Sequence, residues 1–284
     1  MADLLSTLLA VFGLIFVVGS MLSMGLSLTI HMIAEPLRDR RLVLSALLAN
    51  FIVVPALIIF LSTIMPLDMD VKIGMFILAL AAGAPFVPKL TQFAKGNIAV
   101  GVGIMTLLMF VTVIVLPTVL PLMIPGVRVD PWQVAQPLIF LMLIPLGIGL
   151  VVKQRYEQLA EHAAGILNRV TTISIIILLF LFLGAYWDRI TGTFGTGAVG
   201  FSIIFVILSL IIGYYLGGRD PSTRRVFGIA TAQRNIAAGI LTAATNFADR
   251  PLVGVTVLLV SLVSLTTLAI VAGEWGRKGI PSGS

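Results

Sequence analysis

Three consecutive polar residues, Gln233, Arg234 and Asn235, lie near the middle of the otherwise apolar stretch 227–247. A cation near the centre of a bilayer costs roughly 3 kcal/mol on insertion scales. Three adjacent positions cover most of a helix's circumference, so an unbroken helix would point at least one of them toward lipid. The group must therefore lie in protein or in a water-filled cavity, which indicates a transport site. The alternative is a structural arginine that donates to carbonyls of a neighbouring helix.

A second polar group lies in the apolar stretch 72–94, and it contains Gly83, Pro85, Pro88, Lys89, Thr91 and Gln92. Two prolines three positions apart remove two helix donors and free carbonyls one turn earlier. Such breaks are tolerated in a bilayer only where protein or water surrounds them. Lys89 lies about 9 Å inside the surface that Lys95 marks, at 1.5 Å per residue. A proline kink whose lysine snorkels to that surface is therefore a second interpretation.

The composition requires a membrane protein around these two groups. The chain has 284 residues, of which 59% are hydrophobic and only 11% charged, whereas soluble domains carry about 25% charged residues. We predict an all-α polytopic protein that forms one transmembrane unit over residues 1–284, with no nucleic-acid partner. Zero cysteines exclude disulfides and thiolate metal sites. Nine hydrophobic segments are expected, at 4–30, 42–65, 72–94, 97–124, 131–152, 164–187, 197–217, 225–247 and 251–272.

The basic residues orient these segments. Of the eighteen lysines and arginines, twelve lie in loops on one side, four lie on the other, and Lys89 and Arg234 lie inside predicted spans. The positive-inside rule then places the N-terminus outside and the C-terminus in the cytoplasm, and an odd number of spans agrees with opposite termini. We expect an integral protein of the plasma (inner) membrane.

The acidic residues and the two histidines fall in loops or near span boundaries, so no chain of these residues crosses the membrane and an ordinary proton relay is not visible. The spans also hold no Ser/His pair, no paired aspartates and no H-E-x-x-H helix. We therefore predict no enzyme, no catalytic residue, no metal ligand set and no cofactor other than a sodium ion as an option.

Interrupted segments in third and eighth place suggest the two halves of an inverted repeat. In such transporters broken helices meet at mid-membrane, and half-helix N-termini face anionic groups of the substrate. The break in stretch 72–94 is expected at Gly83, Pro85 and Pro88. The predicted substrate-binding residues are Arg234, Lys89, Asn235, Gln233, Thr231, Gln92 and Thr91.

Over nearly its whole length the sequence resembles the bile acid:sodium symporter family. The residues that carry the resemblance are Met21-Leu-Ser-Met-Gly25-Leu-Ser-Leu-Thr29, Asn50-Phe-Ile-Val-Val-Pro55, Ala94-Lys-Gly-Asn-Ile-Ala-Val100 and Ala232-Gln-Arg-Asn235. The resemblance implies a panel domain and a core domain, with two broken helices that cross in the core, and alternating access by movement between the domains. It also implies that this chain is the nine-helix form, which lacks the first of ten helices.

The sodium ligands of the family are largely replaced. The positions of its first sodium site fall here on Val87, Pro88, Gly101 and Met105, and the shared glutamate falls near Ile229 or Ala230. The second site keeps a remnant, because Asn50 and Gln233 match glutamines of sodium-coupled members. Lys89 or Arg234 beside a sodium ion would repel it by about 4 kcal/mol at 4 Å and an effective dielectric near 20.

We therefore hypothesise a secondary active transporter of a small organic anion, in which Lys89 and Arg234 replace bound sodium and transport depends weakly or not at all on sodium. The alternative is a conventional sodium:organic anion symporter with a site rebuilt near Asn50 and Gln233. A third interpretation is an anion channel whose pore these cations line. The sequence does not identify the substrate, the coupled ion, the direction of net transport or the oligomeric state.

Overall fold

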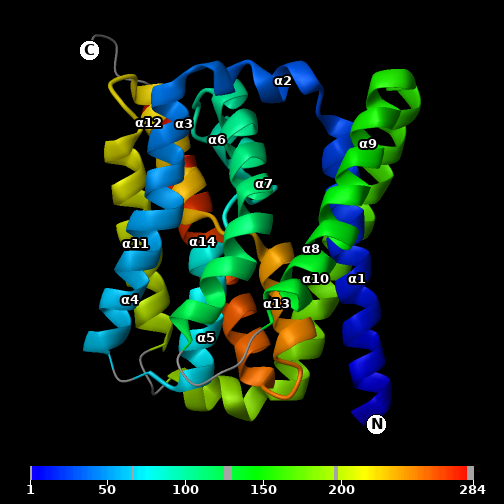
Figure 1. Ribbon diagram of the computed structural model, residues 1–284, viewed down its shortest axis with the longest axis vertical. Coiled ribbons are helices and arrows are strands. Elements are labelled where there is room, and N and C mark those ends of the chain that lie inside the picture. Colours follow the sequence, from blue (N-terminus) through cyan, green and yellow to red (C-terminus); the bar gives the residue numbers. More distant parts are fainter. Residues whose placement is uncertain (1, 66, 125–129, 195–197, 280–284) are drawn as a thin grey trace.

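The computed structural model describes residues 2–65, 67–124, 130–194 and 198–279, which contain helices and no strands. Seven of these helices, some joined end to end, are long and apolar enough to cross a membrane: Thr7–Ser27, Arg40–Ile64, Ile98–Met123, Pro131–Arg155, Glu157–Phe182, Val199–Leu216 and Pro251–Lys278. They match seven of the nine segments expected from the sequence. The N-terminal and C-terminal ends lie at opposite ends of the long axis (Figure 1).

The elements follow one another with short connections. In chain order they are α1 (Ala2–Ser27), α2 (Ile30–Ala34), η1 (Pro36–Arg38), α3 (Arg40–Leu48), the π-helix η2 (Ala49–Val53), α4 (Val54–Ile64), α5 (Met69–Leu80), α6 (Val87–Phe93), α7 (Ile98–Met123), α8 (Pro131–Leu138), the π-helix η3 (Ile139–Leu143), α9 (Ile144–Arg155), α10 (Glu157–Phe194), α11 (Ala198–Leu216), α12 (Pro221–Ala232), α13 (Ile236–Asn246) and α14 (Pro251–Lys278).

Loop aspartates start several of these helices. Asp39, Asp68, Asp130 and Asp220 are the N-caps of α3, α5, α8 and α12, and each carboxylate accepts a backbone N–H of the first turn. An N-cap side chain satisfies one of the donors that a helix start leaves free, and a carboxylate also suits the positive end of the helix dipole. These acidic residues thus have a local structural role outside the spans.

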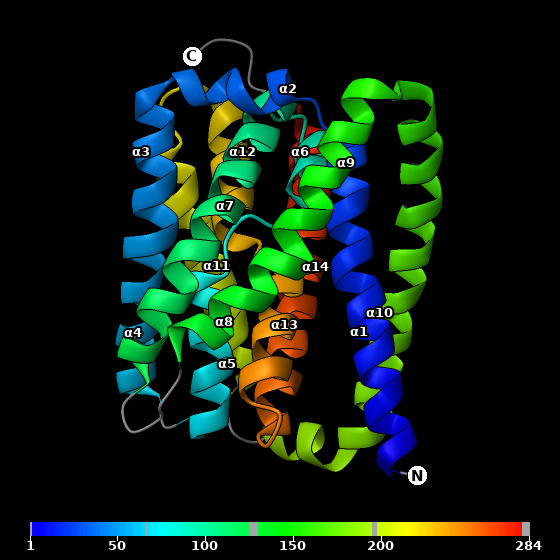
Figure 2. The ribbon, with the colours of Figure 1, turned by 45° about the vertical axis from the view of Figure 1, so that its right-hand side comes forward.

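Three helices stand apart from the rest. α1, α9 and α10 lie side by side on one flank of the molecule (Figure 2). Gly25 of α1 and Gly149 of α9 allow this packing, because a Cβ at Gly25 would lie 2.2 Å from the Leu146 carbonyl oxygen and one at Gly149 would lie 2.6 Å from the Leu22 oxygen. Small residues let two helix backbones approach this closely in a membrane.

Both polar stretches singled out in the sequence are interrupted helices. In the first, α5 ends at Leu80 and α6 begins at Val87. Gly83 has a φ of +77°, and a Cβ there would lie 2.2 Å from the backbone nitrogen of Met109 on α7, so only glycine fits this position. Pro88 sits in the first turn of α6, where its missing N–H removes no helix hydrogen bond. This proline therefore opens the second half-helix, while the extended chain around Gly83 forms the break.

The second break contains neither proline nor glycine. α12 ends at Ala232 and α13 begins at Ile236, with Gln233, Arg234 and Asn235 between them. Asn235 is the N-cap of α13, and its side-chain oxygen accepts the N–H of Ala238. Asparagine is among the best N-cap residues, so the polar group predicted to be a break is also the start signal of a new helix.

The two breaks are bonded to each other. The Asn235 N–H donates to the Ala81 carbonyl at 2.8 Å, and its side-chain Nδ2 donates to the Gly83 carbonyl at 3.1 Å. Thr112 of α7 serves the first break from the other side: its Oγ1 accepts the Ala82 N–H at 3.0 Å and lies 3.1 Å from the Ala82 carbonyl oxygen. Backbone groups that the interruption releases thus find partners within the protein, as a bilayer requires.

The helix contact at Gly149 gives a first prediction. Gly149→Ala should lower the free energy of unfolding by about 1–3 kcal/mol, because the added methyl group overpacks α9 against α1. Gly147→Ala on the same helix is the control, because a Cβ there would have no atom within 4 Å. It should leave stability unchanged or raise it, since alanine stabilises a helix by about 0.5–1 kcal/mol relative to glycine. Thermal unfolding in detergent measures both. Equal stability of the two variants would contradict the close approach.

The hydroxyl of Thr112 gives a second prediction. Thr112→Val keeps the shape but leaves the Ala82 N–H buried without an acceptor, which should cost about 1–3 kcal/mol of stability. Thr118→Val, on the exposed face of the same helix, removes a hydroxyl that bonds only carbonyls of its own helix and should change little. The comparison again uses thermal unfolding of the purified variants, and a Thr112→Val protein as stable as Thr118→Val would argue against this role.

Candidate functional site

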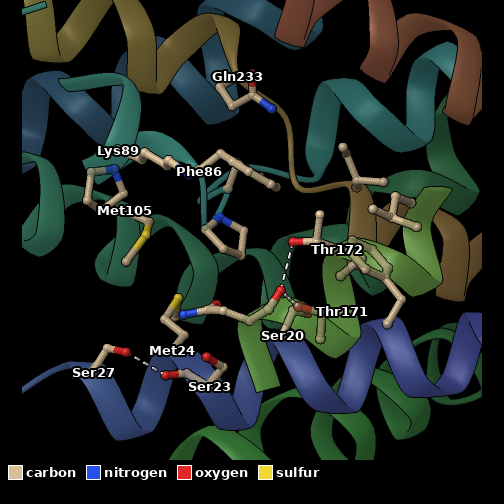
Figure 3. Close-up of a pocket in the computed structure, with 18 of the residues that line it drawn as sticks. Ser20, Ser23, Met24, Ser27, Phe86, Lys89, Met105, Thr171, Thr172 and Gln233 are labelled. Atoms are coloured by element: carbon tan, nitrogen blue, oxygen red, sulfur yellow. Dashed lines mark hydrogen bonds between the residues drawn. The ribbon is translucent and has the colours of Figure 1, made fainter. Parts of the chain in front are cut away.

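A cavity of about 360 Å³ separates the flank formed by α1 and α10 from the two helix breaks. Its near wall consists of Ser20, Ser23, Met24 and Ser27 on α1, with Thr171 and Thr172 on α10; Lys89, Phe86, Met105 and Gln233 lie across from them (Figure 3). Arg234, Ile236 and Ala237 also line it. The cavity therefore lies where the predicted polar stretches meet.

The hydroxyl wall was not predicted from the sequence. Each of the three serines of α1 that line the cavity donates to a backbone carbonyl: Ser20 to Val17, Ser23 to Ala164 and Ser27 to Ser23. With their protons directed to these carbonyls, the hydroxyl groups present lone pairs to a ligand. The serines lie at spacings of three and four residues, which places them on one helix face. That spacing was the sequence signal for a polar helix face. It is weak, because serine is uncharged and is tolerated in an apolar span.

The α10 part of the wall has the same character. Thr171 Oγ1 and Thr172 Oγ1 both donate to the Asn168 carbonyl, at 3.1 and 2.7 Å. Asn168 itself lines the cavity. The hydroxyl groups of this flank therefore offer hydrogen-bond acceptors, the side-chain amide of Asn168 can both donate and accept, and the cationic groups of the site come from the opposite wall.

Lys89 is the exposed cation of the cavity. It lies in the first turn of α6, its side chain lines the cavity, and none of the described residues pairs with its ammonium group. An unpaired ammonium beside apolar side chains such as Phe86 and Met105 attracts an anion more strongly than one in bulk water.

Arg234 is buried, in contrast to Lys89. Its side chain is only 1% exposed, yet it reaches the edge of the cavity. Nη2 donates to the Thr231 carbonyl at 2.6 Å and Nη1 to the Ala79 carbonyl at 3.4 Å, while Nε has no hydrogen-bond partner among the described residues. The ring of Phe205 lies 5.9 Å from the guanidinium carbon. The two carbonyl contacts, to Thr231 and Ala79, are those expected of a structural arginine that bonds backbone carbonyls of neighbouring elements.

Gln233 and Asn50 keep unused polar atoms although both are buried. Gln233 Oε1 accepts from Ser264 of α14 at 3.4 Å, while its Nε2 has no partner in the part of the chain that the structure describes. Asn50, in the π-helix η2, donates to the Ala46 carbonyl and to Thr231 Oγ1 at 3.4 Å, which leaves its Oδ1 free. Thr231 thus connects Asn50 to the end of α12, and the two residues predicted as a sodium remnant lie around the same break.

The other predicted substrate-binding residues lie outside the cavity wall. Asn235 is fully buried and holds the two breaks together, and Thr231 bonds Asn50. Thr91 is buried with its hydroxyl unpartnered against Gly101 of α7, and Gln92 faces outward on α6. Of the seven residues, the structure brings Arg234, Lys89 and Gln233 to the cavity.

Apolar side chains occupy most positions that align with the family's first sodium site. Val87, Met105 and Ile229 are fully buried and Ala230 is 1% exposed, and none of these side chains offers an oxygen ligand. A sodium ion prefers several hard oxygen ligands, usually with a carboxylate.

Comparison with known proteins places these features in a family. The model of the Sodium Bile acid symporter family matches residues 11–192. The chain is 25% identical over 271 residues to "Probable sodium/metabolite cotransporter BASS2, chloroplastic" of Oryza sativa subsp. japonica, covering 92% of this chain and 63% of that protein. It is 24% identical over 270 residues to "Uncharacterized sodium-dependent transporter YocS" of Bacillus subtilis (strain 168), covering 91% and 81%.

A third relative is "Probable sodium/metabolite cotransporter BASS1, chloroplastic" of Arabidopsis thaliana, with 22% identity over 264 residues, covering 91% of this chain and 65% of that protein. The chain thus spans less than two thirds of the length of the two plant relatives. The family and these relatives are transporters and not enzymes, in agreement with the sequence. The family match covers well over half of the chain and includes the first broken helix, so the protein belongs to the sodium bile acid symporter family.

Proposed function

We propose that this protein is a secondary active transporter of a small organic anion and that the cavity between α1, α10 and the helix breaks is its substrate site. The observation that carries the proposal is Lys89, an exposed cation that no described residue pairs with, in a cavity of about 360 Å³ at the meeting point of two broken helices. An anionic group on the substrate would complete its charge balance.

The half-helices add to this positive potential. Ile236 and Ala237, the first two residues of α13, line the cavity, and so do Pro88 and Lys89 in the first turn of α6. A helix N-terminus carries the equivalent of about +0.5 elementary charge and free N–H groups. Gln233 Nε2, a buried donor without a partner, lies beside them. A carboxylate, sulfonate or sulfate suits this set of donors.

The same elements support a nine-pass arrangement. The seven long helices supply seven passes, and α5–α6 and α12–α13 would supply two more as interrupted spans. On this proposal α1, α8–α9 and α10 form the panel domain and the remaining helices form the core domain. The chain is an inverted repeat whose first half lacks one helix, and movement between panel and core exposes the cavity alternately to the two sides.

The names of the relatives describe sodium-dependent transport, and sodium coupling is the property in which we expect this chain to differ from them. We propose that Lys89 and Arg234 supply the positive charge that bound sodium supplies elsewhere, so that transport is weakly sodium-dependent or sodium-independent. The second candidate is conventional sodium symport through a site rebuilt from Asn50, Thr231 and Gln233. Its supporting observation is the buried, unpartnered Oδ1 of Asn50, an oxygen available to a cation.

Counterflow in liposomes tests transport and separates these candidates. We expect vesicles preloaded with one anion to exchange it for a labelled anion in sodium-free buffer, using as probes a short monocarboxylate, a dicarboxylate, an aromatic sulfonate and a steroid carboxylate. Exchange that requires sodium in the wild type, and still requires it in Arg234→Gln, would contradict sodium independence. Flux without trans-stimulation would indicate a channel.

Lys89 provides a direct test of the substrate site. Lys89→Gln removes the charge while keeping a polar side chain, and we expect it to raise KM for the transported anion about tenfold, which corresponds to about 1.4 kcal/mol of lost binding. Lys278→Gln is the control, because Lys278 is an exposed cation at the end of α14, away from the cavity. A KM unchanged by Lys89→Gln would favour the snorkelling interpretation.

The orientation can be tested with single cysteines, since the chain contains none. We propose a plasma (inner) membrane protein with the N-terminus outside and the C-terminus in the cytoplasm. An impermeant maleimide added to intact cells should then label Thr63→Cys at the end of α4 but not Gln154→Cys at the end of α9. The reverse pattern would invert the topology. Both side chains are exposed, so accessibility within the protein does not bias the comparison.

A further inference from the structure

The guanidinium group of Arg234 lies at the carbonyl ends of both interrupted helices. It donates to Ala79 at 3.4 Å and to Thr231 at 2.6 Å. Ala79 is the second-last residue of α5, which ends at Leu80, and Thr231 is the second-last residue of α12, which ends at Ala232. The last four carbonyls of a helix have no partner within the helix. Each such end carries the equivalent of about −0.5 elementary charge.

These two helix ends balance the charge of Arg234. The side chain is 1% exposed, the aromatic ring of Phe205 covers it, and no carboxylate of the described residues bonds it. Two ends of about −0.5 each match one guanidinium charge. A buried charge without such compensation would be strongly unfavourable. Lys89 has no comparable contacts with the described residues and lies exposed at the cavity, so the two cations lie in different surroundings.

We infer that Arg234 is a positioning residue, a resident counter-ion that holds the carbonyl ends of α5 and α12 together, and that the position of its guanidinium is a monovalent-cation site. This inference refines the proposed function by leaving Lys89 as the cation that contacts the substrate. It follows that truncation of Arg234 creates a vacancy in which a free cation can bind. Free guanidinium has the shape and charge of the group removed.

The test is chemical rescue of stability, measured without any substrate. Purified Arg234→Ala should unfold at a Tm several degrees below that of the wild type. Low-millimolar guanidinium chloride, compared with choline chloride at equal ionic strength, should raise that Tm in a saturable manner and leave the wild type unchanged. Lys89→Ala removes an equal charge from the same cavity, and it should show neither the loss of Tm nor the rescue.

Two further variants keep the inference falsifiable if Arg234→Ala does not fold. Arg234→Lys retains the charge and should be folded and more stable than Arg234→Gln, which retains polarity alone. A folded Arg234→Ala that guanidinium does not stabilise would overturn the inference. The inference would also be overturned if Arg234→Gln were as stable as the wild type. It would likewise be overturned if neither Arg234→Lys nor Arg234→Ala folded.

The readout also separates this inference from the proposed function. Because the measurement contains no organic anion, rescue by guanidinium is independent of any transport activity. Absence of rescue would remove the counter-ion role but leave sodium-free counterflow and the role of Lys89 unaffected. Absence of counterflow would remove the transport proposal and leave the cation site in place.

Discussion

The structure depends on how two stretches of broken backbone find hydrogen-bond partners away from water. An interrupted helix releases N–H and C=O groups, and in hydrocarbon each unpartnered group costs several kcal/mol. Here the first break is bonded from one side by Thr112 and from the other by Asn235. Since Asn235 belongs to the second break, each interruption supports the other. This mutual dependence fixes the position of both half-helix N-termini, and with them the cavity.

The cavity lies at the boundary between closely packed units. On one flank Gly25 and Gly149 bring α1 and α9 into backbone contact, and Gly83 does the same for the first break against α7. Between these units lies the cavity, with hydroxyl groups along one wall and cationic groups along the opposite wall (Figure 3). On the proposed mechanism, tight packing within each unit and an open boundary between them would allow one unit to move against the other.

The sequence predicted the interrupted helices because their signals are chemical. Adjacent Gln233, Arg234 and Asn235 are incompatible with lipid, and Gly83 with Pro85 and Pro88 is incompatible with a regular helix. The sequence did not show that Pro85 lies in the break while Pro88 lies in the first turn of α6, because this depends on where α6 begins. It also did not predict Ser20, Ser23 and Ser27, since serines in a span bond their own helix as readily as a ligand. Thr112 and Phe205 matter only through contacts across the fold, which a single sequence does not contain.

A fixed cation has a consequence for energetics that a mobile ion does not. A sodium symporter draws on the sodium gradient, because the ion is released on the far side with the substrate. A lysine or arginine returns with the empty carrier, so on the proposed mechanism it neutralises the anion during the crossing but supplies no gradient. Moving one negative charge into a cell against the membrane potential costs about 2.3 kcal/mol per 100 mV. A carrier whose cations are all resident is therefore suited to export of the anion or to exchange of one anion for another, and not to its accumulation.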